Sequence, residues 1–141
     1  MASILKVDDL RGNTAAGNIT ITSEGGSATM QLQQGVAKAW VNFDASSGTP
    51  TERDSLNVSS LTDNGTGVFS PNFSSNMSST GYSSQGATNA YSSRTTYAGY
   101  GGSTSQFNIT TSSFSMVCVS HYHNSVRDGT EISSSIHGDL A

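Results

Sequence analysis

Ser113-Phe114-Ser115-Met116-Val117-Cys118-Val119-Ser120-His121-Tyr122 is the stretch of this chain that decides its fold. Alternate residues of a β-strand point to opposite faces of its sheet. One face of this stretch carries Phe114, Met116, Cys118 and Tyr122, and the other carries Val117, Val119 and His121. Because apolar residues occur on both faces, the stretch predicts a central strand.

Further strands are predicted on both sides of it. Residues 131–137 place Ile132 and Ile136 on one face, and residues 107–110 alternate in the same way. Residues 55–62 predict one strand with Leu56 and Val58 on a shared face.

Two turn sequences separate predicted strands. Asp63-Asn64-Gly65-Thr66-Gly67 and Asp128-Gly129 contain residues that suit tight hairpin turns. Short strands at this spacing predict an all-β fold, an antiparallel β-sandwich of jelly-roll type.

The N-terminal part predicts a stem. Short strands are expected at residues 4–7 and 19–22, and a helix over residues 28–40, which are good helix formers apart from Gly35. Leu32, Val36 and Ala39 would share one face of that helix, as in a stem packed around a symmetry axis. A surface helix or an irregular linker is the alternative.

We expect this docking and stem segment to span residues 1–45 and a head domain to span residues 46–141. Trp40, the single tryptophan, is expected to be a packing hub between the two, with a ligand platform as the alternative. The docking and stem residues are Ile4, Leu5, Val7, Leu32, Val36 and Trp40.

The composition favours an assembly. Only 33% of the 141 residues are apolar, so one chain buries little apolar area to offset its conformational entropy. Surface shared between subunits is the usual remedy, and we therefore expect a homo-oligomer.

The composition also limits the kinds of partner that this protein can bind. The formal charge is −4 with 6 Lys and Arg, which does not supply the basic patch that nucleic acid requires. No apolar run reaches membrane-spanning length, and no secretory signal is expected at the N-terminus. The single cysteine, Cys118, excludes an intramolecular disulfide and a Cys-based zinc site, and a buried thiol is expected.

Two longer stretches, residues 34–43 (QGVAKAWVNF) and 53–67 (RDSLNVSSLTDNGTG), resemble a signature of phage tail-fibre-like proteins, many of them from cyanophages. The resemblance extends over most of the chain through Leu5-Lys6-Val7, Asn72-Phe73, Met77, Tyr82 and Ile136-His137-Gly138-Asp139.

This resemblance implies a homotrimeric virion protein that is assembled in the host cytoplasm. Its N-terminal piece would dock onto other virion proteins of the tail or capsid, and its C-terminal domain would face outward. The expected function is a short tail fibre or fibre-like appendage that contacts the host surface. The alternative is a capsid decoration protein, head fibre or tail-connector component that binds only virion proteins.

The segment from Thr80 to Ser105 is poor in aliphatic residues and rich in Gly, Ser and Tyr, which predicts long loops or exposed edge strands. Tyrosine offers a broad contact area at low entropic cost, and its small polar neighbours offer adaptable hydrogen bonds. The candidate receptor site for a host polysaccharide or outer-membrane protein is therefore Tyr82, Tyr91, Arg94, Tyr97 and Tyr100. Packing between subunits or over sheet edges is the alternative.

His121 and His123 are expected on one face of their strand. In a three-fold assembly, three such pairs could coordinate one metal ion on the axis, although ordinary surface histidines are the alternative and no cofactor is expected.

A glycan-cleaving enzyme would need two carboxylates across a cleft. Asp44, Glu52, Asp54 and Asp63 are interpreted instead as loop charges, caps and turn formers, so we expect no enzymatic activity.

Overall fold

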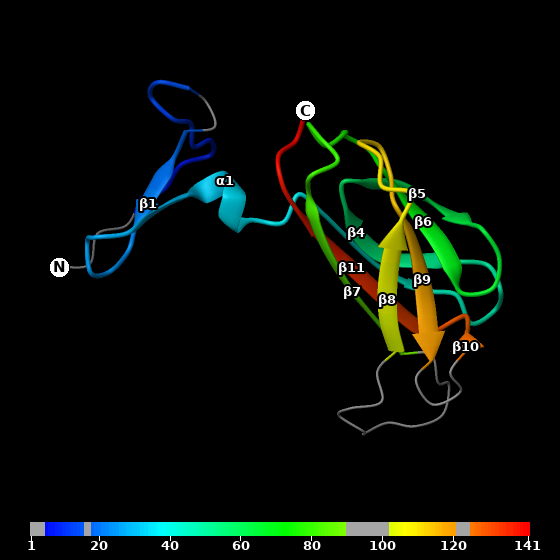
Figure 1. Ribbon diagram of the computed structural model, residues 1–141. Helices are drawn as coiled ribbons and strands as arrows, with labels where there is room; N and C mark the ends of the chain where they lie inside the picture. Colours follow the sequence, from blue (N-terminus) through cyan, green and yellow to red (C-terminus); the bar gives the residue numbers. More distant parts are fainter. Residues whose placement is uncertain (1–4, 16–17, 90–101, 121–124) are drawn as a thin grey trace. The chain divides into compact units, whose positions relative to one another are not determined.

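The computed structural model describes residues 5–15, 18–89, 102–120 and 125–141 (Figure 1). The chain forms two compact units, Met1–Val36 and Ala37–Ala141. The division therefore lies before Trp40 and not after residue 45. The reason is that residues 39–44 form a strand with a hydrogen-bonded neighbour on each side inside the second unit.

The first unit is a small hairpin with one helical turn. β1 (Thr20–Thr22) pairs with β2 (Thr29–Gln31), and α1 spans Leu32–Gly35. Every residue from Thr20 to Gln31 is exposed, and no described residue of this unit is buried. A two-stranded hairpin without a covered face is marginal in water.

The helix expected over residues 28–40 is wrong, because only Leu32–Gly35 are helical. Gln31 provides no side-chain cap, and Val36 is extended with φ −108°. Gly35 and β-branched Val36 both disfavour a helix, and one uncapped turn cannot propagate. Residues 5–7 form no strand, whereas the strand expected at residues 19–22 is present as β1.

The second unit is built from antiparallel strands. Their bounds are β3 (Ala39–Asp44), β4 (Thr51–Leu56), β5 (Val58–Asp63), β6 (Val68–Phe73), β7 (Ser83–Asn89), β8 (Gly102–Phe107), β9 (Ser115–Ser120), β10 (Ser125–Val126) and β11 (Glu131–His137). The order in the sheet is β4-β3-β11-β7-β8-β9-β6-β5, and β10 pairs with β9. The expected all-β, antiparallel, sandwich-like fold is thereby confirmed at this level.

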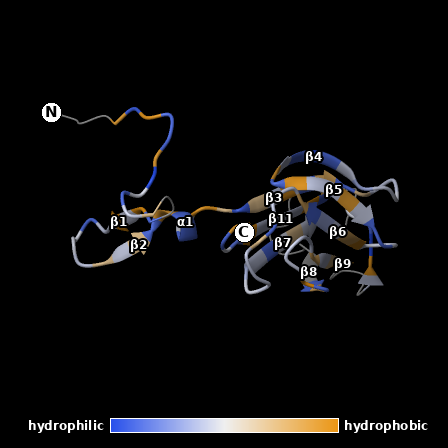
Figure 2. Cartoon of the chain, turned by 90° about the horizontal axis from the view of Figure 1, so that it is seen from above, coloured by the Kyte–Doolittle hydropathy of each residue, from blue (hydrophilic) through white to orange (hydrophobic). Residues whose placement is uncertain are grey.

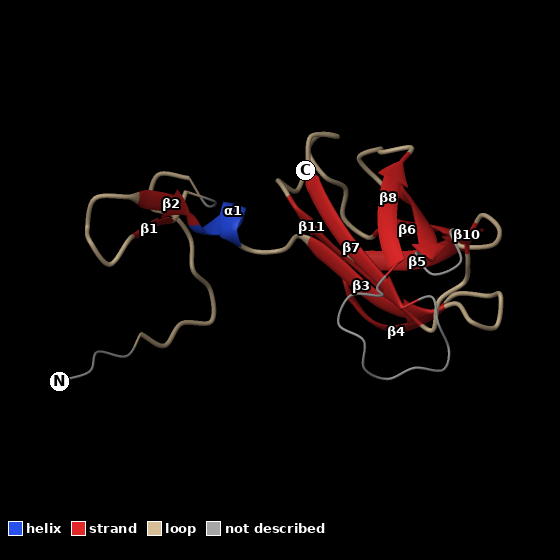
Figure 3. Ribbon diagram, turned by 60° about the horizontal axis from the view of Figure 1, so that its bottom comes forward, coloured by secondary structure: helices blue, strands red, loops and turns tan. Residues whose placement is uncertain are grey.

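The sheet folds over so that its two halves enclose one core (Figure 3). Phe43 of β3 and Phe69 of β6 come from opposite halves, and their rings meet edge to face with centroids 5.3 Å apart. Hydrophobic and hydrophilic residues alternate along several strands (Figure 2). β3 and β11 follow this alternation closely, since every second residue of each is buried.

The strongest sequence predictions hold. Phe114, Met116 and Cys118 are fully buried, as are Ile132 and Ile136 of β11. The turn at residues 63–67 joins β5 to β6, and the Asp63 carboxylate accepts a hydrogen bond from the Gly65 N–H.

Three other predictions are wrong. Residues 55–62 are not one strand, because Asn57 adopts φ 56° and separates β4 from β5. In the segment 80–105, β7 and β8 are interior strands of the sheet rather than exposed edges, and residues 90–101 lie outside the described residues. Asp128-Gly129 is not a hairpin turn, since β10 pairs with β9 and not with β11.

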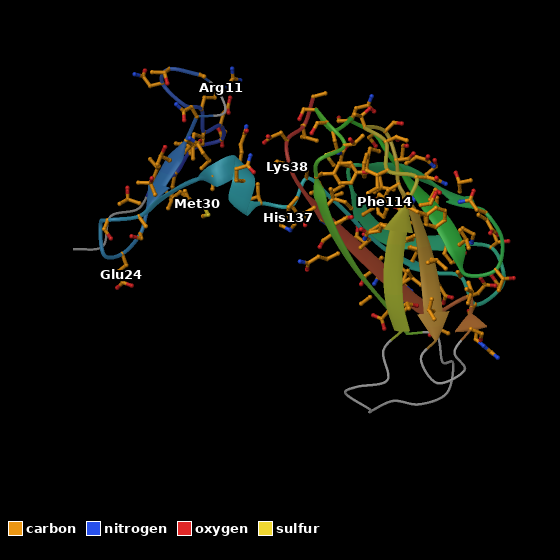
Figure 4. The ribbon with its side chains drawn as sticks, viewed as in Figure 1. Arg11, Glu24, Met30, Lys38, Phe114 and His137 are labelled. Atoms are coloured by element: carbon orange, nitrogen blue, oxygen red, sulfur yellow. The ribbon has the colours of Figure 1, made fainter. Side chains whose placement is uncertain are left out.

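The sandwich has two distinct ends. The chain enters β3 at the N-proximal end, which we define as residues 37–38, 57, 74–82, 108–113 and 137–141. Lys38 and His137 lie at this end (Figure 4). The opposite end, which we call the loop end, consists of residues 45–50, 63–67 and 126–130. β7 and β9 also terminate at the loop end, where Asn89 pairs with Glu131 and Ser120 pairs with Ser125.

Candidate functional site

Tyr82, one of the candidate receptor residues, is largely buried in the sandwich. It is 8% exposed, and its ring packs against Phe73 with centroids 5.8 Å apart. Its hydroxyl donates to the carbonyl oxygens of Thr110 (3.0 Å) and Ser113 (3.2 Å). Burial raises the pKa of Tyr82. The residue therefore anchors the 108–113 loop to the core. The other candidate receptor residues, Tyr91, Arg94, Tyr97 and Tyr100, lie outside the described residues.

The two candidate metal ligands, His121 and His123, also lie outside the described residues. Within the part of the chain that the structure describes, no cluster of three or more His, Cys, Asp and Glu side chains is present. The same part contains no helix long and apolar enough to cross a membrane.

Leu32, Val36 and Ala39, expected on one face of a helix, do not share a helix, since α1 ends at Gly35 and Ala39 belongs to β3. Leu5 and Val7 are 76% and 53% exposed in the first unit, Leu32 is half-buried in α1, and Val36 follows α1. Ile4 lies outside the described residues. Trp40 belongs to β3 of the second unit, where it is half-buried on the outer face of the sheet, opposite Leu56 and Ser135.

Side chains at the loop end surround an open hollow of about 460 Å³. Its volume falls within the usual range for small-ligand sites. The lining comes from three loops and strand β10: Ser46, Thr66, Ser125, Val126, Arg127, Asp128 and Thr130. Four of these side chains end in hydroxyl groups, and two are charged.

Hydrogen bonds between the loops fix this hollow. The Gly67 N–H donates to the Asp128 carboxylate (2.6 Å), and the Cys118 N–H donates to the Gly67 carbonyl (2.8 Å). The Arg127 N–H donates to the Cys118 carbonyl (3.1 Å), and the Ala45 N–H donates to the Gly129 carbonyl (2.9 Å). The three loops are therefore held to one another and to β9.

Gly67 is required at this position. Its φ is 65°, in the left-handed region, and a Cβ there would lie 2.5 Å from Val126 and 2.7 Å from the backbone of Arg127. Any side chain at position 67 would therefore push Val126 and Arg127, which line the hollow, away from the 63–67 turn.

An ion pair borders the hollow. Arg53 of β4 reaches the Asp44 carboxylate (3.0 Å) and donates to the Thr130 carbonyl (2.6 Å). The pKa of Asp44 is lowered, chiefly by hydrogen bonds from the side chain and backbone of Ser46 and with a contribution from Arg53. Asp44 is therefore ionised at neutral pH, and it holds Ser46 at the rim.

Arg127 and Asp128 retain free hydrogen-bonding groups. In the described ranges, the Arg127 guanidinium donates only from Nε, to Ser125 (3.3 Å), and Asp128 accepts only through Oδ1. The remaining guanidinium N–H groups and Oδ2 of Asp128 can therefore bind a ligand. This arrangement can recognise a polar molecule. Val126, which is 41% exposed, is the one apolar side chain in the described part of the lining.

Sequence analysis did not identify this hollow. Its residues are spread over 85 positions, from Ser46 to Thr130, and only Thr66 and Asp128 belong to the quoted turn sequences. The available signal was the pair of turn sequences, because both contribute to the loop end. The pairing of β10 with β9, which brings those turns together, leaves no local trace in the sequence.

Searches against protein-family models, curated proteins and solved structures find no match for this chain. The likeness to phage tail-fibre-like proteins therefore rests on the sequence motifs alone.

Proposed function

We propose that this chain is a non-enzymatic structural protein of a phage virion, a short homotrimeric tail fibre or fibre-like appendage. The N-terminal unit docks onto the particle, and the second unit contacts the host surface. The observation that carries this proposal is that the two ends of the second unit differ. The chain enters it at the N-proximal end, whereas the hollow and the termini of β7 and β9 lie at the loop end.

The first unit supports a docking role. Leu5, Val7, Leu10, Ile21 and Met30 are between 42% and 76% exposed, in a unit where no described residue is buried. Apolar side chains that a small unit cannot bury itself are commonly covered by another protein. Other copies of the chain and other virion proteins are the partners we propose for it.

The second unit supports a rigid contact role. It has its own core, and its loop end is held by hydrogen bonds between loops. Binding residues are often presented on loops that a rigid scaffold positions. We further propose that the sandwich is of jelly-roll type, because β11 lies beside β3 and β9 lies beside β6, although each pair is distant in sequence.

The decisive experiment is to label particles of the phage that encodes the chain with antibodies against it and to image them. A few labelled positions around the tail are expected. Labels spread over the whole capsid would indicate a decoration protein instead, and unlabelled particles would contradict a virion role.

Receptor contact is tested by adsorption. A Tyr91→Ala, Tyr97→Ala double variant should assemble into particles that adsorb poorly to host cells. The matched control is Thr80→Ala, an exposed change at the N-proximal end, which should leave adsorption unchanged. Normal adsorption by the double variant would remove these tyrosines from the contact surface.

A further inference from the structure

We propose that the hollow at the loop end is a saccharide subsite that takes one pyranose unit of a polysaccharide. Arg127 and Asp128 hydrogen-bond the ring hydroxyls, and Val126 contacts the apolar face of the ring. This inference rests on the proposed contact with the host surface and names the chemistry of that contact.

The hydrogen-bonding groups match a sugar better than a simple anion. Sugar hydroxyls both donate and accept, and so do the side chains of Ser46, Thr66 and Ser125 that line the hollow. The free guanidinium N–H groups of Arg127 supply donors, and Oδ2 of Asp128 supplies a strong acceptor. A carboxylate in the lining disfavours a free anion, whereas it accepts readily from a neutral polyol.

The shape of the site also favours a saccharide. The hollow is open, and among the described residues that line it Val126 is the only apolar side chain. It therefore offers no enclosed apolar pocket of the kind that would hold an aromatic or aliphatic ligand. A pyranose ring presents C–H groups on one face and hydroxyls around its edge, which fits one exposed valine surrounded by polar groups.

The site is arranged before a ligand arrives. The bonds from Gly67 to Asp128 and from Arg127 to Cys118 fix the backbone of both charged residues. Arg53 holds the carbonyl of Thr130, and Asp44, which Arg53 also contacts, holds Ser46. A site whose loops are already ordered loses less conformational entropy on binding.

The test is an NMR titration of the full chain, labelled with ¹⁵N. The probes are the methyl glycosides of glucose, galactose, N-acetylglucosamine and glucuronic acid at millimolar concentrations, with sodium acetate as the simple anion. At least one glycoside should shift the amide signals of residues 66–67 and 126–130, and acetate should not.

Arg127→Ala should weaken the binding of that glycoside by about tenfold, the usual effect of losing a charged hydrogen-bond donor. Asp128→Asn keeps the size of the side chain and should also weaken it. The matched control is Arg11→Ala, which removes an exposed arginine from the first unit and should leave the affinity unchanged. Retained signal dispersion in each variant shows that the sandwich is folded.

Several results would overturn the subsite. These are the absence of shifts with every glycoside, equal shifts with acetate, or unchanged affinity in Arg127→Ala. Particle labelling distinguishes this failure from failure of the proposed function. Labelled tails without glycoside binding would contradict only the saccharide subsite. Glycoside binding by a protein that is missing from particles would contradict only the virion role.

Discussion

Cys118 lies in the middle of β9 with no exposed surface, and burial raises the pKa of its thiol to about 11. In the unfolded chain the same thiol loses its proton near pH 9.0. Between these two pH values the folded state therefore binds more protons than the unfolded state. Stability falls with rising pH wherever the unfolded state binds fewer protons.

We accordingly predict that the free energy of unfolding decreases between pH 9 and pH 11, by on the order of 2 kcal/mol from this thiol. Urea denaturation at a series of pH values measures this decrease in the free energy of unfolding. Cys118→Ala lowers the stability at every pH because it leaves a cavity, but it should flatten the decrease across this window. Equal slopes for the wild type and the variant would show that the thiol does not cause the decrease.

Asn57 organises the corner between β4 and β5. It adopts φ 56°, which non-glycine residues other than Asn and Asp rarely do. Its amide group donates to the Ser75 carbonyl (3.0 Å) and accepts from the Ser75 N–H (2.7 Å), so it joins this corner to the 74–82 segment. One residue thus ends a strand and closes part of the N-proximal end.

Two substitutions separate these roles of Asn57. Asn57→Gly keeps the backbone conformation and removes both side-chain hydrogen bonds, which should cost about 1–2 kcal/mol. Asn57→Ala removes the same hydrogen bonds but, unlike glycine, keeps a Cβ in the left-handed region. It should therefore cost about 1 kcal/mol more than Asn57→Gly. Denaturant unfolding measures both, with Thr80→Ala as the exposed control. If alanine is tolerated as well as glycine, the positive φ does not constrain this corner.

The elements that sequence predicted are those whose apolar residues alternate. β9 buries Met116 and Cys118, and β11 buries Ile132 and Ile136 with Ser134 between them, which is the period of two that indicates a strand. β7 and β8 consist largely of Ser, Gly and Thr. They are placed in the sheet by backbone hydrogen bonds to β11 and β9. Such strands have no hydrophobic period. The hollow was unpredictable for a related reason, since its loops meet only through strand pairing.

The two units of the whole molecule differ in self-sufficiency. The second unit surrounds a core of aromatic and aliphatic side chains, whereas the described part of the first unit buries none of its residues. Ile21 and Met30 face each other across the β1–β2 hairpin and are 42% and 51% exposed. If the chain forms the proposed homotrimer, these side chains are the natural contacts between subunits.

We predict that sedimentation of the full chain gives about three times the mass of one 14.6 kDa chain. An Ile21→Asp, Met30→Asp double variant should dissociate to single chains, because two carboxylates in an apolar contact leave desolvated charges. Its thermal unfolding should remain close to that of the wild type, since neither residue contributes to the core of the sandwich. Leu56→Asp is the matched control, because Leu56 is an equally exposed apolar residue of β4, at 47%. A wild-type protein that sediments as single chains would contradict the trimer. Dissociation by Leu56→Asp alone would show that the contact between subunits lies in the second unit.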